Sequence, residues 1–272
     1  MTINGPLLLV GCGKMGGALL SGWLERGVAA SDVTLVEPNA AAVADFQARG
    51  ARVLPSVAEL PSGYHPALVL LAVKPQMMDQ VMGPLARFAR PGTLFLSIAA
   101  GKTLAYFYRH LGEAVALVRS MPNTPAAVGR GMSVLVAGPG VSPAQRAAAE
   151  SLMAAVGETA WVEQESLIDV VTAVSGGGPA YVFLLAEMLA EAGRASGLPD
   201  ELAARLARVT VAGSGELLHQ SPESPATLRQ NVTSPAGTTL EALKVMMAPD
   251  GLQPIVTRAI AAATRRSREL AG

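Results

Sequence analysis

The stretch that decides the fold is LLLVGCGKMG, residues 7–16. Four apolar residues, typical of a short buried strand, lead directly into glycines spaced Gly-x-Gly-x-x-Gly at the start of a helix. In that context Gly11 permits the tight turn, Gly13 lets the backbone approach a pyrophosphate, and Gly16 lets the helix pack close to the strand. The unpaired N–H groups of the helix N-terminus favour the anion. We predict that this turn binds a nicotinamide dinucleotide, although a purely structural turn is the alternative; its residues are Gly11, Cys12, Gly13, Lys14, Met15 and Gly16.

Short apolar runs alternate with amphipathic stretches through the first half of the chain. Strand-like runs occupy residues 7–10, 33–37, 67–73, 93–98 and 115–119, with further runs at 132–137 and 159–162. Such alternation predicts a parallel sheet with helices on both faces. Beyond about residue 165 only helix-like segments follow. We predict an α/β protein with a Rossmann-type doubly wound sheet in residues 1–165, followed by an all-helical domain in residues 166–272 for oligomerisation and substrate binding.

The composition indicates self-association. Half of the 272 residues are hydrophobic and 15% are charged, whereas roughly 25% are charged in an average soluble chain. The segment Tyr181–Ala190 is apolar nearly all the way round its helix, which indicates burial on several sides. We predict a homo-oligomer formed through the helical domain. No uninterrupted apolar run approaches the ~20 residues of a membrane-spanning helix, and the N-terminus lacks the features of an export signal, so we expect no membrane association.

Charge and cysteine content exclude several classes of function. The 21 basic and 21 acidic residues give a formal net charge of zero, so no long-range field gathers nucleic acid. Cys12 is the only cysteine, which excludes an internal disulfide and a cysteine-based metal cluster and fits a reducing, cytoplasmic compartment. The histidines His65, His110 and His219 show neither metal-ligand spacing nor a partnered acid. We predict no metal site, no Ser-His triad, and a reaction in which a bound cofactor carries the chemistry.

Further cofactor-binding residues are expected where strands end, because ligands of such sheets bind at the carboxyl edge. Glu37 ends the second strand, where an acidic side chain accepts hydrogen bonds from a ribose 2′-OH; taken alone it favours NAD over NADP, and a solvated strand end is the alternative. Lys74 is a candidate base, but a positioning role is favoured. Asn123 has the donors and acceptor to hold a carboxamide, although turn formation also explains it. The candidates in these turns are Glu37, Ala72, Val73, Lys74, Pro75, Ala99, Ala100 and Asn123.

Two small polar segments of the second half precede helices. They are residues 174–181 and 231–239. Each is expected to be a loop that offers backbone N–H groups at a helix N-terminus, the geometry that binds a carboxylate. Ordinary capping by Ser234, Thr238 or Thr239 is the alternative. Two such segments beside a dinucleotide site favour substrate binding.

Six motifs, taken in order, resemble those of pyrroline-5-carboxylate reductases. They are residues 11–16, 72–76, 97–101, 121–125, 174–181 and 233–239. The glycine motif is shared by many dehydrogenases, whereas the last two together are specific. The resemblance runs from about residue 7 to residue 245. It implies the last step of proline biosynthesis, in which hydride passes from NADPH or NADH to the C=N carbon of 1-pyrroline-5-carboxylate and gives L-proline. An imine that has taken a proton from solvent is a good hydride acceptor. The protein therefore needs no general acid, which accounts for the lack of a catalytic histidine.

The resemblance also implies roles for individual residues. Thr239 hydrogen-bonds the ring nitrogen and is the candidate catalytic residue, while the loop 234–239 holds the substrate carboxylate. Asn231 matches a residue near the cofactor. Members of the family assemble through their helical domains as dimers and often as decamers. The substrate-binding residues that the resemblance implies are Ser175, Gly178, Pro179, Ala180, Ser234, Gly237, Thr238 and Thr239.

Three positions depart from the family pattern. Gly177 stands where serine is common, which removes a hydroxyl from the pocket. Ala236 stands where glycine is common, and a positive φ there costs of order 1 kcal/mol for alanine. Glu37 stands where many relatives that use NADPH have small or basic residues, so the cofactor preference stays open.

Two alternatives to this family remain. β-Hydroxyacid dehydrogenases also join a Rossmann domain to a helical one, but they place a catalytic lysine in a helix after the junction, and residues 179–197 contain no lysine. A non-catalytic dinucleotide-binding sensor needs the Gly11 turn but not the loop at 234–239. The presence of both segments favours an enzyme.

Overall fold

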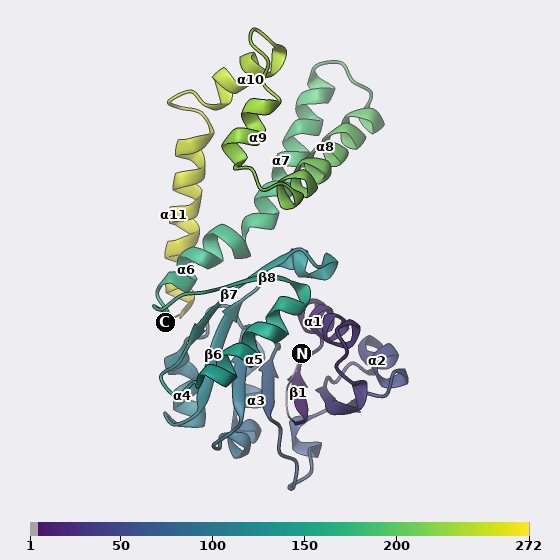
Figure 1. The fold of residues 1–272 in the computed structure, drawn as a ribbon, viewed down its shortest axis with the longest axis vertical. Coiled ribbons are helices and arrows are strands. Elements are labelled where there is room, and N and C mark those ends of the chain that lie inside the picture. Colours follow the sequence, from purple (N-terminus) through teal and green to yellow (C-terminus); the bar gives the residue numbers. More distant parts are fainter. Residues whose placement is uncertain (1–4, 272) are drawn as a thin grey trace. The chain divides into compact units, whose positions relative to one another are not determined.

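The structure is a computed structural model that describes residues 5–271. The chain forms two compact units, whose elements are labelled in Figure 1. The sheet unit extends to Gly176 and includes the end of the chain from Thr264, whereas the helical unit consists of Gly177–Ala263. The predicted domain boundary after residue 165 rests on where the strands end, and it stays a prediction.

The sheet unit contains an eight-stranded sheet with the order β3-β2-β1-β4-β5-β6-β7-β8. Neighbouring strands from β3 to β6 are parallel, β7 is antiparallel to β6, and β8 is parallel to β7. The order confirms the predicted doubly wound sheet, because the chain crosses from one side of β1 to the other between β3 and β4. The strands are β1 Leu7–Val10, β2 Val33–Val36, β3 Arg52–Leu54, β4 Leu68–Leu71, β5 Leu94–Ser97, β6 Ala116–Met121, β7 Gly131–Ala137 and β8 Gly157–Trp161.

Helices cover both faces of this sheet. Helices α1 (Lys14–Glu25) and α5 (Pro143–Met153) pack with one set of alternate strand residues, to which Leu9 belongs. Helices α3 (Met78–Leu85) and α4 (Leu104–Leu111) pack with the other set. Successive side chains of a strand point to opposite faces, so strands covered on both sides are apolar throughout. This is why the strands were visible in the sequence.

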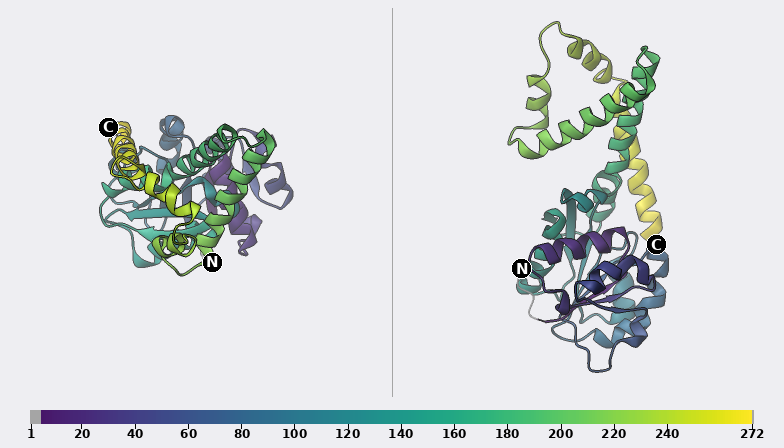
Figure 2. Two further views of the ribbon diagram at one scale, coloured as in Figure 1. Left: turned by 90° about the horizontal axis from the view of Figure 1, so that it is seen from above. Right: turned by 90° about the vertical axis from the view of Figure 1, so that its right-hand side faces the viewer.

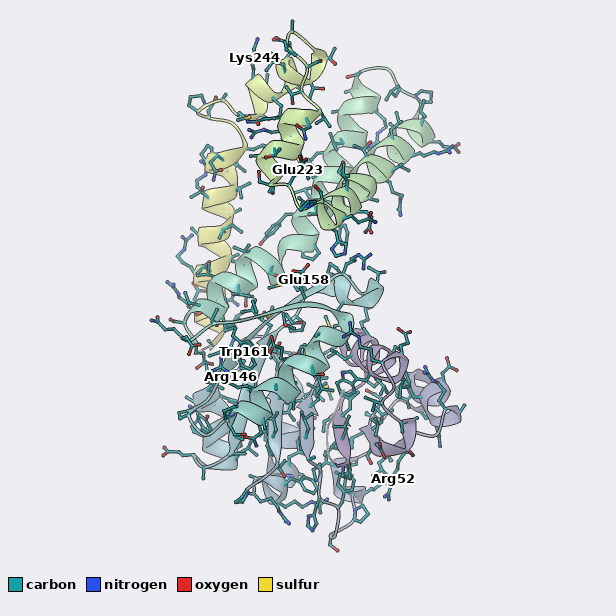
Figure 3. The ribbon with its side chains drawn as sticks, in the orientation of Figure 1. Arg52, Arg146, Glu158, Trp161, Glu223 and Lys244 are labelled. Carbon is teal, nitrogen blue, oxygen red and sulfur yellow. The ribbon has the colours of Figure 1, made fainter. Side chains whose placement is uncertain are left out.

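The strand β3 was not predicted. It has only three residues, and its first residue, Arg52, is exposed. Arg52 is labelled in Figure 3. A segment this short and half-exposed at the edge of the sheet carries no apolar run, so the sequence gives no periodic signal for it. A short helix, α2 (Ala44–Ala48), precedes it.

The second half of the chain is helical, as predicted. Helix α6 lies in the sheet unit, and the end of α11 returns to that unit, where the Ser267 hydroxyl donates to Asp169 Oδ1 at 2.7 Å. In the helical unit α7 and α8 contact each other. Figure 2 shows them as two long helices that follow one another along the chain. The helices are α6 Leu167–Val171, α7 Gly178–Ala195, α8 Asp200–Gln220, α9 Pro225–Asn231, α10 Thr238–Met246 and α11 Leu252–Ala271.

Large apolar side chains of the helical unit are exposed. On α7, Phe183 is 62% exposed and Met188 is 55% exposed. The buried apolar residues of α7 and α8 are the alanines Ala190, Ala203 and Ala207. Because soluble monomers rarely expose large contiguous apolar surface, this surface is expected to be covered by another molecule.

One stretch among the described residues, Leu167–Ala195, is long and apolar enough to cross a membrane by length and composition. Length and composition alone do not contradict the expectation of no membrane association. That expectation considered only uninterrupted apolar runs, whereas here glycines and single charged residues interrupt a continuous helix. A helix covered by a second protein chain has the same composition, so the absence of membrane association stays a prediction.

Candidate active site

The glycine-rich turn after β1 depends on close backbone contacts. Gly11 has φ +91°, and a Cβ atom there would lie 2.8 Å from the backbone of Ala72 and Val73. A Cβ at Gly16 would lie 2.5 Å from the Gly11 carbonyl oxygen. A Cβ at Gly13 would meet nothing within 4 Å, so this residue faces open space. Gly11 and Gly16 are therefore required by packing within the chain, and Gly13 leaves room for a ligand.

The N-terminus of α1 has free hydrogen-bond donors. Its N-cap residue is Gly13, no side chain caps it, and its first turn contains no acidic residue. Uncapped N–H groups and the helix dipole favour an anion such as a pyrophosphate. The residues of this turn thus fit the dinucleotide that the sequence predicts.

Glu37 joins the end of β2 to the glycine-rich turn. Its Oε2 accepts a hydrogen bond from the Cys12 amide at 2.9 Å, and its Oε1 accepts one from the Asn39 amide at 3.0 Å. The backbone is fixed as well, since the Glu37 amide donates to the Leu54 carbonyl at 3.0 Å. Burial, reinforced by the charge of Glu37, raises the pKa of the Cys12 thiol to about 11. Cys12 therefore stays protonated and is not a nucleophile.

The turns after β4 and β5 lie at the same edge of the sheet. The Ala72 amide donates to the Val10 carbonyl at 2.8 Å, and the Ile98 amide donates to the Leu71 carbonyl at 3.1 Å. Lys74 is exposed and precedes a 3₁₀ helix, Pro75–Met77. Ala99 is buried, whereas Ala100 is exposed. The structure thus brings Gly11, Gly16, Glu37, Ala72 and Val73 together at one edge, as predicted for a parallel sheet.

Asn123 has partners within the chain for both its donor and its acceptor atoms. Its Oδ1 accepts from the Met132 amide at 2.8 Å, and its Nδ2 donates to the carbonyl oxygen and the hydroxyl of Ser175 at 3.3 and 3.2 Å. These contacts give Asn123 a structural role in the described chain. Its role in holding a nicotinamide carboxamide stays a prediction.

The segment around Ser175 is not a loop that opens a helix, so that prediction is wrong. Residues Thr172–Gly176 form a π-helical turn that continues α6 towards α7. In an α-helix the Ser175 carbonyl would accept from residue 179, but Pro179 has no N–H. The amide of Asn123 takes the place of that donor. A Cβ at Gly176 would lie 2.5 Å from Met121 Cε, so the flexible end of the Met121 side chain would have to move.

The loop before α10 is confirmed as the start of a helix. Its N-cap residue is Gly237, and no side chain caps this N-terminus. Capping by Ser234, Thr238 or Thr239 is therefore not observed. Ala236 has φ +56°, and among the described residues it is the non-glycine residue with positive φ. The backbone strain expected from alanine in place of the family's glycine is therefore present. Both Thr238 and Thr239 are exposed in the single chain.

Asn231, at the end of α9, contacts an acidic residue of the helical unit. Its Nδ2 donates to Glu223 Oε2 at 3.0 Å, and Glu223 is labelled in Figure 3. Both residues are exposed. The proximity of Asn231 to the cofactor stays a prediction.

A partly buried ion pair in the second half of β6 was missed by the sequence analysis. Arg119 is 3% exposed, and its Nη1 donates to Glu165 Oε1 at 2.8 Å. The same oxygen accepts from the Leu104 amide at the start of α4 at 2.8 Å. The pair thus joins β6, α4 and the segment before α6. The available signal was an arginine at the end of the apolar run 115–119, since buried charges are paired.

Comparison with known proteins places the chain in a family. The family model for an NADP oxidoreductase, coenzyme F420-dependent, matches residues 7–101, and the model for pyrroline-5-carboxylate reductase dimerisation matches residues 165–270. A pyrroline-5-carboxylate reductase of Pseudomonas aeruginosa is 41% identical over 266 residues, which cover 97% of this chain and 96% of that protein. The chain belongs to the pyrroline-5-carboxylate reductase family. A Synechocystis reductase is 39% identical over 264 residues, which cover 96% of this chain and 97% of the relative.

Solved structures of the family have the same fold. The pyrroline-5-carboxylate reductase of Coxiella burnetii aligns with a TM-score of 0.92 at 33% identity and covers 99% of this chain and 100% of its own. A Plasmodium falciparum pyrroline carboxylate reductase with NADP bound aligns at 0.80 with 27% identity, over 99% of both chains. The predicted family, fold class, enzyme class and NAD(P)H cofactor are confirmed, and the dimerisation model supports self-association through the helical region.

The strain at Ala236 predicts that Ala236→Gly stabilises the chain. Glycine adopts positive φ without steric cost, so the free energy of unfolding is expected to rise by roughly 0.5–1 kcal/mol. Denaturant unfolding at fixed chain concentration measures this change. The matched control is Ala242→Gly in the middle of α10, which should destabilise by about 1 kcal/mol. Equal destabilisation by both substitutions would contradict the strain.

The missing N–H of Pro179 predicts energetic coupling with Asn123. Asn123→Leu leaves the Met132 amide and the Ser175 carbonyl without partners, so we expect a loss of roughly 2–4 kcal/mol of stability. Pro179→Ala restores an N–H four residues after Ser175. In that background the loss caused by Asn123→Leu should be smaller by about 1 kcal/mol in a double-mutant cycle of denaturant unfolding. Additive losses would overturn this account of the π-helical turn.

Proposed function

We propose that the chain reduces 1-pyrroline-5-carboxylate to L-proline, the last step of proline biosynthesis, with the cofactor at the Gly11–Gly16 turn and the substrate carboxylate at the start of α10. The observation that carries this proposal is a pair of helix N-termini. Helices α1 and α10 both begin after a glycine N-cap, Gly13 and Gly237, without a side-chain cap. Free backbone donors at both places suit two anions, a pyrophosphate and a carboxylate.

The cofactor side uses the edge of the sheet. When bound, NAD(P)H supplies the hydride. The backbone donors at the start of α1 bind its pyrophosphate, and Glu37 lies beside that turn. The turns after β4 and β5 would lie against the cofactor, and Asn123 would support it from the sheet unit. The residues of these turns are Ala72, Val73, Lys74, Pro75, Ala99 and Ala100. Asn231 has a role near the cofactor only through the resemblance to the family.

The substrate side uses the loop before α10 and the start of α7. Backbone amides after Gly237 bind the carboxylate, and the Thr239 hydroxyl bonds the ring nitrogen and orients the C=N bond. The imine takes its proton from solvent, so the chain needs no general acid of its own. The segment from Ser175 to Ala180 lines the same pocket. Orientation of a reactive iminium accounts for a site without catalytic histidine.

We further propose that the chain is a cytoplasmic homodimer associated through its helical region, with a decamer of five dimers as the larger assembly that the resemblance implies. Exposed apolar side chains of α7, such as Phe183 and Met188, support the association. A single cysteine with a protonated thiol suits a reducing compartment. The described residues contain no group of three or more His, Cys, Asp or Glu side chains that could hold a metal ion.

The role of Thr239 is tested by two substitutions. Thr239→Ala removes the hydroxyl, and we expect kcat/KM for pyrroline-5-carboxylate to fall by about tenfold or more, because a hydrogen bond to the reacting nitrogen is lost. Thr239→Ser keeps the hydroxyl and should retain most of the activity. The assay follows NAD(P)H absorbance. Full kcat/KM in the alanine variant would remove the hydroxyl from the mechanism, and no substrate-dependent oxidation in the unaltered chain would refute the function.

Self-association is tested by placing a charge on α7. Phe183→Asp would bury a carboxylate in an apolar interface, so we expect sedimentation to give the mass of one chain, 27.9 kDa. The control is Glu158→Lys on β8 of the sheet unit, an exposed residue labelled in Figure 3, which should leave the assembly unchanged. An assembly that survives Phe183→Asp would place the interface elsewhere. Binding of the unaltered chain to neutral lipid vesicles would contradict a protein interface on α7.

A further inference from the structure

We propose that Glu37 makes this chain prefer NADH to NADPH. The inference rests on the proposed placement of the dinucleotide at the Gly11–Gly16 turn, and it goes further by assigning the selection to one carboxylate. The family match leaves the choice open, because it gives NAD(P)H as the cofactor class. The choice is decided by what faces the 2′ position of the adenosine ribose, which carries a hydroxyl in NADH and a phosphate in NADPH.

The carboxylate of Glu37 is held in place from two sides. The Cys12 amide donates to one oxygen at 2.9 Å and the Asn39 amide donates to the other at 3.0 Å. The neighbouring Gly11 amide donates to the Val36 carbonyl at 2.8 Å, so consecutive residues of the glycine-rich turn bond to consecutive residues at the end of β2. If Glu37 rotated away, the Cys12 amide would lose its acceptor. The side chain therefore stays beside the turn when a ligand binds.

The chemistry of a fixed carboxylate discriminates between the two cofactors. An ionised carboxylate only accepts hydrogen bonds and offers about four lone-pair sites. Two sites are used by the amides of Cys12 and Asn39, so others remain for a ribose hydroxyl, which can donate. A 2′-phosphate is anionic near neutral pH and offers no such donor, so it would meet the carboxylate as a like charge.

No ion pair among residues 5–271 offsets this charge. In the described part of the chain Glu37 has no ion-pair partner. Residues 38–48, which follow β2, contain no lysine or arginine and include a second acid, Asp45. Sites for NADP commonly place an arginine near this point to bind the phosphate. The nearest cations along the chain are Lys14, in the first turn of α1, and Arg49, after α2. Lys14 belongs to the turn that faces the pyrophosphate.

The experiment measures binding without catalysis. Calorimetric titration of the full chain with ADP-ribose and with 2′-phospho-ADP-ribose compares the two ribose forms in the absence of a nicotinamide or substrate. We expect ADP-ribose to bind at least about tenfold more tightly, because a like charge at a binding site is strongly unfavourable. The preference should shrink as ionic strength rises, since screening weakens the repulsion of the phosphate.

Two variants distinguish the effect of Glu37 on the ribose preference from the effect of removing any negative charge nearby. Glu37→Gln keeps the size of the side chain and an acceptor for the Cys12 amide but removes the charge, so the preference should fall by about tenfold. Asp45→Asn removes one charge from an exposed position of the same segment and should leave the preference within about twofold, because exposed charges are screened. The ratio of kcat/KM for NADH to that for NADPH should follow the same order.

The outcomes distinguish this inference from the proposed function. Equal or tighter binding of 2′-phospho-ADP-ribose by the unaltered chain would overturn the preference and leave the reductase activity intact. An unchanged preference in Glu37→Gln would assign selectivity to another residue. If neither ligand bound, the placement of the dinucleotide at the Gly11–Gly16 turn would fail as well, and the inference with it.

Discussion

The turn after β1 is in direct backbone contact with the turn after β4, with no side chain between them. A Cβ atom at Gly11 would lie 2.8 Å from the backbone of Ala72 and Val73, which is closer than carbon atoms approach without distortion. Gly16 allows the first turn of α1 to close over the Gly11 carbonyl in the same way. Because of this contact, α1 begins at the carboxyl edge of the sheet, beside the ends of β2 and β4. The proposed cofactor site depends on that one constraint.

Both proposed anion sites consist of backbone N–H groups. Because no side chain caps these groups, the chain without ligand is less stable than it would be with capped helices. A serine or aspartate in place of the glycine N-cap of α1 would satisfy helix N–H groups and stabilise that helix by roughly a few tenths of a kcal/mol. It would also occupy the donors that a ligand needs. Before α10 the chain carries the further strain of Ala236 at φ +56°. Ligand binding offsets these costs, so cofactor and substrate are expected to stabilise the fold as they bind.

The features that could be predicted from the sequence are those that a local pattern of residues determines. Strands such as Leu7–Val10 were visible because both faces are buried, and the glycine turn was visible because close backbone contact requires Gly11 and Gly16. The positive φ of Ala236 was also anticipated. The turn at Ser175 was misread because glycines followed by Pro179 are typical of a loop. What keeps it helical is the amide of Asn123, which is 52 residues away in the chain and replaces the missing N–H. Such a contact leaves no local signal, and the same holds for the partner of Arg119.

In the helical unit small side chains are buried and large apolar side chains are exposed, which is the reverse of an ordinary protein core. Where α7 meets α8, the residues are small: Ala190 and Ala203 are buried, and a Cβ at Gly193 would lie 3.4 Å from that of Ala203. Larger residues such as Phe183 and Val209 are each 62% exposed. Small residues bring two helices close but bury little apolar area, so this pair gains little stability alone. The larger gain comes when a second molecule covers the outer side chains. Folding of this unit and its association therefore act as one equilibrium, in which stability depends on chain concentration.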